Sequence, residues 1–200
     1  MKKKFVDYCM SIIQSYKKDL SSRDIDKYRY GLEGLYLTIT KIIVIIIISL
    51  ILGIFKETIL LILIFNGIRF FAFGVHAKRS IDCLISSTLF FIGFPLLSIH
   101  LTIPIIVKYI LFIPIVLLIG IFSPADTKKR PLISIKKRKI YKICSIIVSF
   151  IYMNLSIIIK DNTLSNCFIF ALIIQIIVIL PITYKIFGVE YNNYKNYETN

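Results

Sequence analysis

Six apolar runs, separated by short polar turns, occupy most of this chain. They cover residues 37–55, 59–75, 81–99, 105–122, 140–159 and 167–187. A helix of about 20 residues crosses the hydrocarbon core of a bilayer, so each run is a candidate membrane segment. The pattern therefore predicts an all-α fold, a polytopic membrane helical bundle with about six membrane segments. The second and third runs carry polar residues, so they are expected either to span the membrane or to be re-entrant.

The first 36 residues are polar and basic, and no run within them is long enough to span. Apolar side chains recur there at roughly helical spacing, at Phe5, Tyr8, Cys9, Ile12, Ile13 and Tyr16. This spacing predicts an amphipathic helix on the membrane surface, and a solubilising arm is the alternative. The whole chain is expected to form a single membrane domain. Its parts are the interfacial arm 1–36, the first four segments 37–122, a basic loop 123–139, the last two segments 140–187 and a tail 188–200.

Composition narrows the class of protein. Hydrophobic residues make up 57% of the chain, and the mean hydropathy is +0.81. The formal net charge of +14 could suggest a nucleic-acid partner, but basic loops beside membrane segments explain it better, so no nucleic acid is expected. Four cysteines, with no CxxC pair and no zinc-like spacing, predict neither a disulfide framework nor a metal site. A cleavable signal peptide is not predicted, because polar residues soon interrupt the apolar stretch after the initial lysines.

Lysine and arginine are unevenly distributed among the connections. With the N-terminus inside, the inside connections are the arm, the turn 76–80, the loop 123–139 and the tail, which together hold nearly all the basic residues. The outside turns at 56–58, 98–102 and 160–166 are poor in charge. The positive-inside rule then places both termini in the cytoplasm and the turn 76–80 at the cytoplasmic face of the membrane.

The candidate chemistry lies in residues 66–83, which read NGIRFFAFGVHAKRSIDC. Ionisable residues at membrane depth mark functional sites by default, and Cys with His makes a thiol nucleophile and its base. His76 and Cys83 would lie about 10 Å apart along one continuous helix, beyond the roughly 3 Å of a hydrogen bond. We therefore expect the chain to bend between them, at Gly74 and the polar turn that follows. The prediction is Cys83 as nucleophile and His76 as general base, then as general acid to the leaving amine.

Neighbouring residues have candidate supporting roles. Arg69 could bind a substrate carboxylate or stabilise an oxyanion, and the positive charges around His76 favour a thiolate. Asp82 could orient His76. The alternative for each lone cysteine is structural, because free cysteine packs as a small hydrophobe. Cys9, Cys144 and Cys167 have no base nearby and are given that interpretation, and His100 is interpreted as interfacial.

Two further charged groups have alternative interpretations. Glu33 lies just before the first apolar run, as an interfacial carboxylate or as the partner of a basic group. The loop 123–139 carries two basic clusters, one of Lys128, Lys129 and Arg130 and a second of Lys136, Lys137, Arg138 and Lys139. They form a cationic surface for an acidic peptide or an anionic lipid membrane, or they only set the topology. Asp126 is expected to pair with Lys128 or Arg130.

The same residues resemble a known family. Arg69, Gly74, His76, Ala77 and Cys83 form an RxxxxGxHA pattern followed by cysteine. Residues 30–33 read YGLE, and residues 123–132 read SPADTKKRPL. Together these marks are similar to those of the accessory gene regulator B (AgrB) family of membrane peptidases, over most of the chain. One departure is the pair Phe73–Gly74, where many members have two glycines.

The resemblance implies a cysteine endopeptidase of the cell membrane that acts in quorum sensing and virulence regulation. Its substrate would be an AgrD-like precursor peptide with an amphipathic leader, a central signal segment and an acidic tail. Cys83 would be the nucleophile and His76 its base, with Arg69, Gly74, Glu33, Asp126, Lys128, Lys129 and Arg130 binding substrate or supporting the site. The resemblance also implies a homodimer. No cofactor is implied, because transfer of an acyl group between thiols is near thermoneutral.

Two other classes of function stay open at this point. A small transporter or peptide exporter would have Arg69 and His76 lining its path, and peptide movement would survive loss of the Cys83 thiol. A structural or assembly factor would depend on neither residue.

Overall fold

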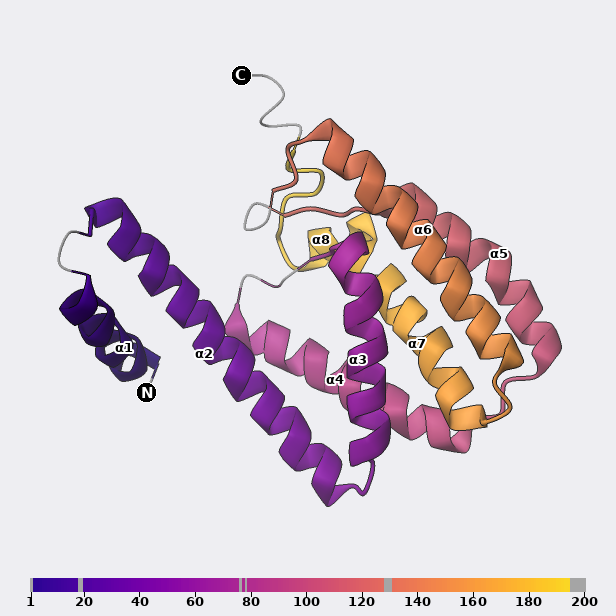
Figure 1. The fold of residues 1–200 in the computed structure, drawn as a ribbon. Coiled ribbons are helices and arrows are strands. Elements are labelled where there is room, and N and C mark those ends of the chain that lie inside the picture. The colour runs from indigo at the N-terminus through magenta and orange to yellow at the C-terminus, as the bar shows by residue number, and fades with distance from the viewer. Residues whose placement is uncertain (1, 18–19, 76, 78, 128–130, 195–200) are drawn as a thin grey trace. The chain divides into compact units, whose positions relative to one another are not determined.

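The computed structural model describes residues 2–17, 20–75, 77, 79–127 and 131–194. Among these residues all the named elements are helices. The helices are α1 Lys2–Tyr16, α2 Ser22–Ile51, α3 Phe55–Ala72, α4 Ser80–His100, α5 Ile105–Phe122, α6 Ile135–Ile158, α7 Asn162–Ile179 and α8 Pro181–Ile186 (Figure 1). The chain divides into two compact units, residues 1–47 and residues 48–200. The predicted all-α class is confirmed.

The first unit contains α1 and most of α2. Lys2 pairs with Glu33 at 2.9 Å, and Arg29 pairs with Asp7 at 3.1 Å, so charged pairs join the two helices. The predicted N-terminal helix is present. Its buried apolar side chains are Val6 and Met10, whereas Tyr8 and Ile12 of the predicted apolar face are exposed.

Several predicted boundaries were wrong. The first long helix begins at Ser22 instead of residue 37, because the two glycines of RYGLEGLY do not interrupt it. It ends near Gly53, whose φ of +70° is the left-handed conformation that commonly follows a helix. Residues 56–58, predicted as a turn, therefore lie in the first turn of α3.

The last predicted segment is also divided differently. Its helix α7 begins at Asn162, where the Asp161 carboxylate accepts a hydrogen bond from the Leu164 amide and caps the helix. It ends at Ile179, because Pro181 has no amide hydrogen with which to continue the ladder, and the short α8 follows. The predicted run 167–187 thus corresponds to two helices.

Among the described residues, five helices are long and apolar enough to cross a membrane, so this is a multi-pass membrane protein. They are Asp24–Ile51, Ser80–His100, Ile105–Phe122, Ile135–Ile158 and Asn162–Ile179. The helix α3 has 18 residues but carries Lys56, Glu57 and Arg69. Exposed isoleucines such as Ile110 and Ile113, each 67% exposed, provide an apolar outer surface.

The core of the second unit is built around α7, which contacts α3, α4, α5 and α6 (Figure 1). Over its apolar window 56% of α7 is buried, against 11–22% for the other candidate spans. At one end of this bundle the buried Lys108 ammonium donates to the Ser156 carbonyl at 2.9 Å and to Ser165 Oγ at 2.6 Å. The candidate site lies at the opposite end.

Candidate active site

The predicted break between His76 and Cys83 is present, because α3 ends at Ala72 and α4 begins at Ser80. Phe73 has a φ of 59° and Gly74 a φ of 129°, so the backbone turns sharply as it leaves α3. Residues 73–75 are all buried. The connection leading to His76 therefore starts inside the protein rather than in a solvated loop.

Arg69 holds the start of this connection. Its Nη1 donates to the Phe73 carbonyl at 2.9 Å, and its Nη2 donates to the carbonyls of Gly74 and Val75 at 3.1 and 2.9 Å. The planar, fork-shaped guanidinium suits this geometry, since its donors point in fixed directions at successive acceptors. Gln175 of α7 also donates to the Phe73 carbonyl, at 2.8 Å. The hydrogen bonds described for Arg69 thus go to the chain's own backbone.

The connection is also paired with the segment that follows α5. The Gly74 amide donates to the Ala125 carbonyl at 2.9 Å, and the Ala125 amide donates to the Ala72 carbonyl at 3.0 Å. On its other side the Val75 amide donates to the Val178 carbonyl of α7 at 2.9 Å. Two of the sequence motifs, 50 residues apart, therefore meet in space.

Gly74 is required by this packing. A β-carbon at this position would overlap Arg69 Nη1 and lie 2.8 Å from the Val178 carbonyl oxygen. Its φ of 129° is also a conformation that residues with a β-carbon rarely adopt. Both constraints explain a glycine directly before the predicted catalytic segment.

The Ala125 carbonyl has a second donor, the buried Tyr184 hydroxyl of α8, at 2.7 Å. Burial raises the pKa of this phenol, so it stays protonated and able to donate at neutral pH. Sequence reasoning missed Tyr184. It was placed within the apolar run 167–187 with no special role, and its partner is 59 residues away.

Asp126 is fully buried, and its carboxylate pairs with Arg138 of α6 at 2.9 Å. The same arginine donates to the Pro124 carbonyl at 3.2 Å. Asp126 was expected to pair with Lys128 or Arg130, but the described partner is Arg138. A buried carboxylate needs a cation. The sequence predicted that Asp126 pairs with a cation, but neither its burial nor the choice of Arg138.

Cys83 lies in the first turn of α4 and is half-buried. Its amide donates to the Arg79 carbonyl at 3.2 Å, and its carbonyl is 3.3 Å from Ser86 Oγ, which lies one turn later. The amino-terminal end of a helix carries partial positive charge, which favours a nearby anion. A nucleophile placed here is therefore on a rigid element and partly accessible.

Comparisons with known proteins show which family this sequence resembles. The sequence model described as "Accessory gene regulator B" matches residues 6–179. An AgrB-like protein of Clostridium acetobutylicum is 34% identical over 88% of this chain and 84% of its own length. The accessory gene regulator protein B of Staphylococcus aureus is 36% identical over 77% of this chain and 80% of its own length.

The chain belongs to the AgrB family. Membership of this family assigns the chain to accessory gene regulation. A Listeria monocytogenes AgrB-like protein is 29% identical over 86% of this chain. No solved structure matches the chain. The matched region contains both paired motifs and all of α7, but it stops before α8 and Tyr184.

The remaining predicted site residues of this AgrB-family chain fall into two groups. Glu33 is in the first unit, where its carboxylate pairs with the Lys2 ammonium. His76, Lys128, Lys129 and Arg130 lie outside the described residues. The pairing of His76 with Cys83 therefore stays a prediction.

Proposed function

We propose that this protein is a membrane cysteine endopeptidase that removes the acidic tail of an AgrD-like precursor peptide. Its products are the free tail and a cyclic thiolactone or lactone signal. The observation that carries the proposal is Cys83, half-buried in the first turn of α4 beside a connection fixed by Arg69. Family membership supports it, since residues 6–179 match over the whole of this region.

The proposed reaction has two acyl transfers. His76 takes the Cys83 proton, and the thiolate attacks the carbonyl carbon of the bond before the tail. The carbon–nitrogen bond breaks, His76 returns the proton to the leaving amine, and the peptide remains as a thioester on Cys83. An internal cysteine or serine of the peptide then attacks the thioester, which closes the ring and restores the Cys83 thiol.

The bundle suits such an intermediate. A thioester keeps its acyl-transfer potential only where water is scarce, and residues 73–75 before the reactive segment are buried. The proposed active site faces the cytoplasm, with both termini on that side. Lysines of α6 would attract the acidic tail, because opposite charges steer association near a charged surface.

The test uses the full-length protein in lipid with a candidate precursor peptide from a neighbouring reading frame. Mass spectrometry should detect a peptidyl adduct on Cys83 together with the released tail. Cys83→Ser should reduce cleavage by at least about 1000-fold, because an alcohol is a far weaker nucleophile than a thiolate. Cys144→Ser is the matched control, since this cysteine of α6 is also half-buried and free.

Unchanged cleavage by the Cys83→Ser protein would refute the peptidase. Peptide that crosses vesicle membranes uncleaved, equally with and without the thiol, would instead support an exporter. If the protein's role in producing the signal depended on neither Cys83 nor His76, the result would support an assembly factor.

A further inference from the structure

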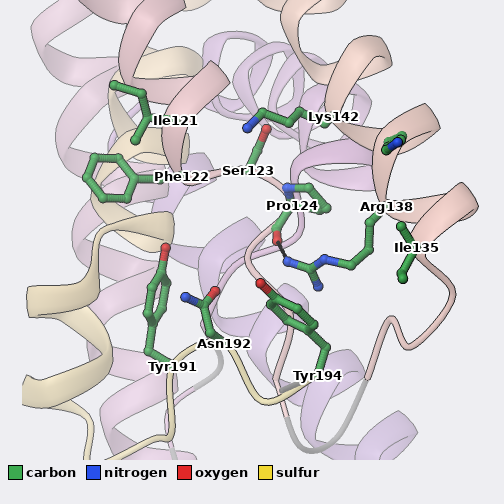
Figure 2. A pocket seen from close by; sticks show the side chains of 11 residues that line it. Ile121, Phe122, Ser123, Pro124, Ile135, Arg138, Lys142, Tyr191, Asn192 and Tyr194 are labelled. Atoms are coloured by element: carbon green, nitrogen blue, oxygen red, sulfur yellow. Dashed lines mark hydrogen bonds between the residues drawn. The ribbon is translucent and has the colours of Figure 1, made fainter. Parts of the chain in front are cut away.

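A cavity of about 410 Å³ opens where α5 ends, α6 begins and the C-terminal tail returns to the bundle (Figure 2). It is separate from the proposed nucleophile, which lies on α4. Its wall includes Arg138, Lys139 and Lys142 of α6, and no acidic residue of the described part of the chain lines it. Arg138 is already neutralised by Asp126, so among the described lining residues the two lysines are the cations available to a ligand.

One polar group in the wall has no partner to explain its burial. Ser123 is only 4% exposed, and its hydroxyl makes no hydrogen bond to any of the described residues. A buried hydroxyl without a partner is costly, at roughly 1–3 kcal/mol. Ser123 is one of the residues that line the cavity, so a ligand that reached its hydroxyl and accepted a hydrogen bond would remove the cost.

The rest of the wall is amphipathic. Ile121 at the end of α5 and Ile135 at the start of α6 are 63% and 59% exposed. Tyr191 and Tyr194 of the tail complete the wall, and the Tyr194 ring lies 3.5 Å from the Arg138 guanidinium carbon. Exposed isoleucines beside lysines and tyrosines are typical of the boundary between lipid chains and headgroups.

We propose that this cavity is a binding site for an anionic phospholipid of the surrounding leaflet. The phosphate lies against Lys139, Lys142 and the Ser123 hydroxyl, and the acyl chains run along Ile121 and Ile135. The exposed apolar wall favours a lipid over an acidic peptide, because a peptide tail of carboxylates would leave those isoleucines uncovered. The lysines favour an anionic lipid over a zwitterionic one.

The site is connected to the active-site frame. Ser123 and Pro124 directly precede Ala125, whose backbone pairs with Ala72 and Gly74. Arg138, in the cavity wall, donates a hydrogen bond to the Pro124 carbonyl, and Figure 2 draws this contact. A lipid bound here therefore stabilises the segment that holds the connection before His76.

The test is native mass spectrometry of the full-length protein titrated with phosphatidylglycerol or phosphatidylcholine. The variant K139Q/K142Q removes the two cations from the cavity. The variant K136Q/K137Q makes the same change of charge in the same turns of α6, at lysines that do not line the cavity. Wild type and K136Q/K137Q should retain one tightly bound phosphatidylglycerol, and K139Q/K142Q should bind it about tenfold more weakly.

Thermal unfolding gives an independent measurement. Phosphatidylglycerol should raise the unfolding temperature of the wild type and of K139R/K142R, which keeps both charges, but not that of K139Q/K142Q. Equal losses of lipid binding in K139Q/K142Q and K136Q/K137Q would overturn the proposal, because only bulk charge would then matter. It would also be overturned if K139Q/K142Q kept the lipid but lost binding of a polyglutamate peptide, which would make a peptide the occupant.

Discussion

Arg69 is a cation in a mostly apolar helix, and its described hydrogen bonds go to three successive backbone carbonyls. Hydrogen bonds from a charged donor to buried acceptors contribute about 1.5–3 kcal/mol each. The arginine therefore acts on the conformation of residues 73–75, through which the chain reaches His76. Its geometry supports a positioning role rather than the substrate contact that its charge suggested.

Replacing Arg69 by lysine tests this role. An ammonium is a compact donor and does not reproduce the fork, so Arg69→Lys should lower kcat for peptide cleavage by roughly tenfold or more. KM should change little, because a positioning role leaves substrate binding to other residues. A raised KM with unchanged kcat would contradict the positioning role and restore direct substrate binding.

Gly74 gives a second residue-scale prediction. Gly74→Ala should destabilise the protein by roughly 1–3 kcal/mol and abolish cleavage, because the new methyl group meets Arg69 and the Val178 carbonyl in a strained conformation. Thermal unfolding in detergent measures the effect. Gly93→Ala in α4 is the matched control, since a β-carbon there meets nothing within 4 Å. Equal unfolding temperatures for the two variants would show that a β-carbon at position 74 does not destabilise the protein.

At the scale of elements, one ion pair joins the segment after α5 to α6. Asp126 has no exposed side-chain area and Arg138 has 16% exposed, so solvent screens this pair little. Removing one partner of a buried pair is strongly destabilising, by about 3–5 kcal/mol, because the other charge stays buried.

Arg138→Gln should therefore lower stability by several kcal/mol, and the double variant Asp126→Asn/Arg138→Gln should recover part of the loss. A double-mutant cycle from denaturant unfolding measures the coupling. Lys136→Gln is the surface control on the same helix turn. If the double variant were no more stable than Arg138→Gln, the Asp126–Arg138 pair would not stabilise the contact between the segment after α5 and α6.

Elements were more predictable than their ends and their partners. The apolar runs located α4 and α5 within one residue, because length and hydropathy determine a membrane helix. The start of α2 was misplaced because polar residues can continue a helix outside the membrane. Of the site, the break after Gly74 was readable from its residue types. The contacts of Gln175, Tyr184 and Arg138 were not, since each partner is distant in the sequence and depends on the folded bundle.

At the scale of the whole molecule, the direction of α3 determines the topology. Its C-terminal end meets the segment after α5 and the end of α7, through the Gly74 and Val75 amides. An 18-residue helix is about 27 Å long, so its first turn lies nearly a bilayer core away. Midway along α3, the Ile64 carbonyl accepts a hydrogen bond from Tyr152 of α6 at 3.0 Å. A helix packed along the bundle in this way is expected to cross the membrane despite its charges.

This geometry makes a prediction about the termini. With α3 crossing, the helices α2 to α7 traverse the membrane an even number of times, so both termini lie on the same side. The positive-inside rule predicts that this side is the cytoplasm. Topology reporters fused to each terminus should both report the cytoplasm. A reporter inserted at residues 159–161, between α6 and α7, should report the outside and serves as the control. A C-terminal reporter found outside, with the N-terminal one inside, would mean that one of these helices is re-entrant, and the three charges of α3 make it the first candidate.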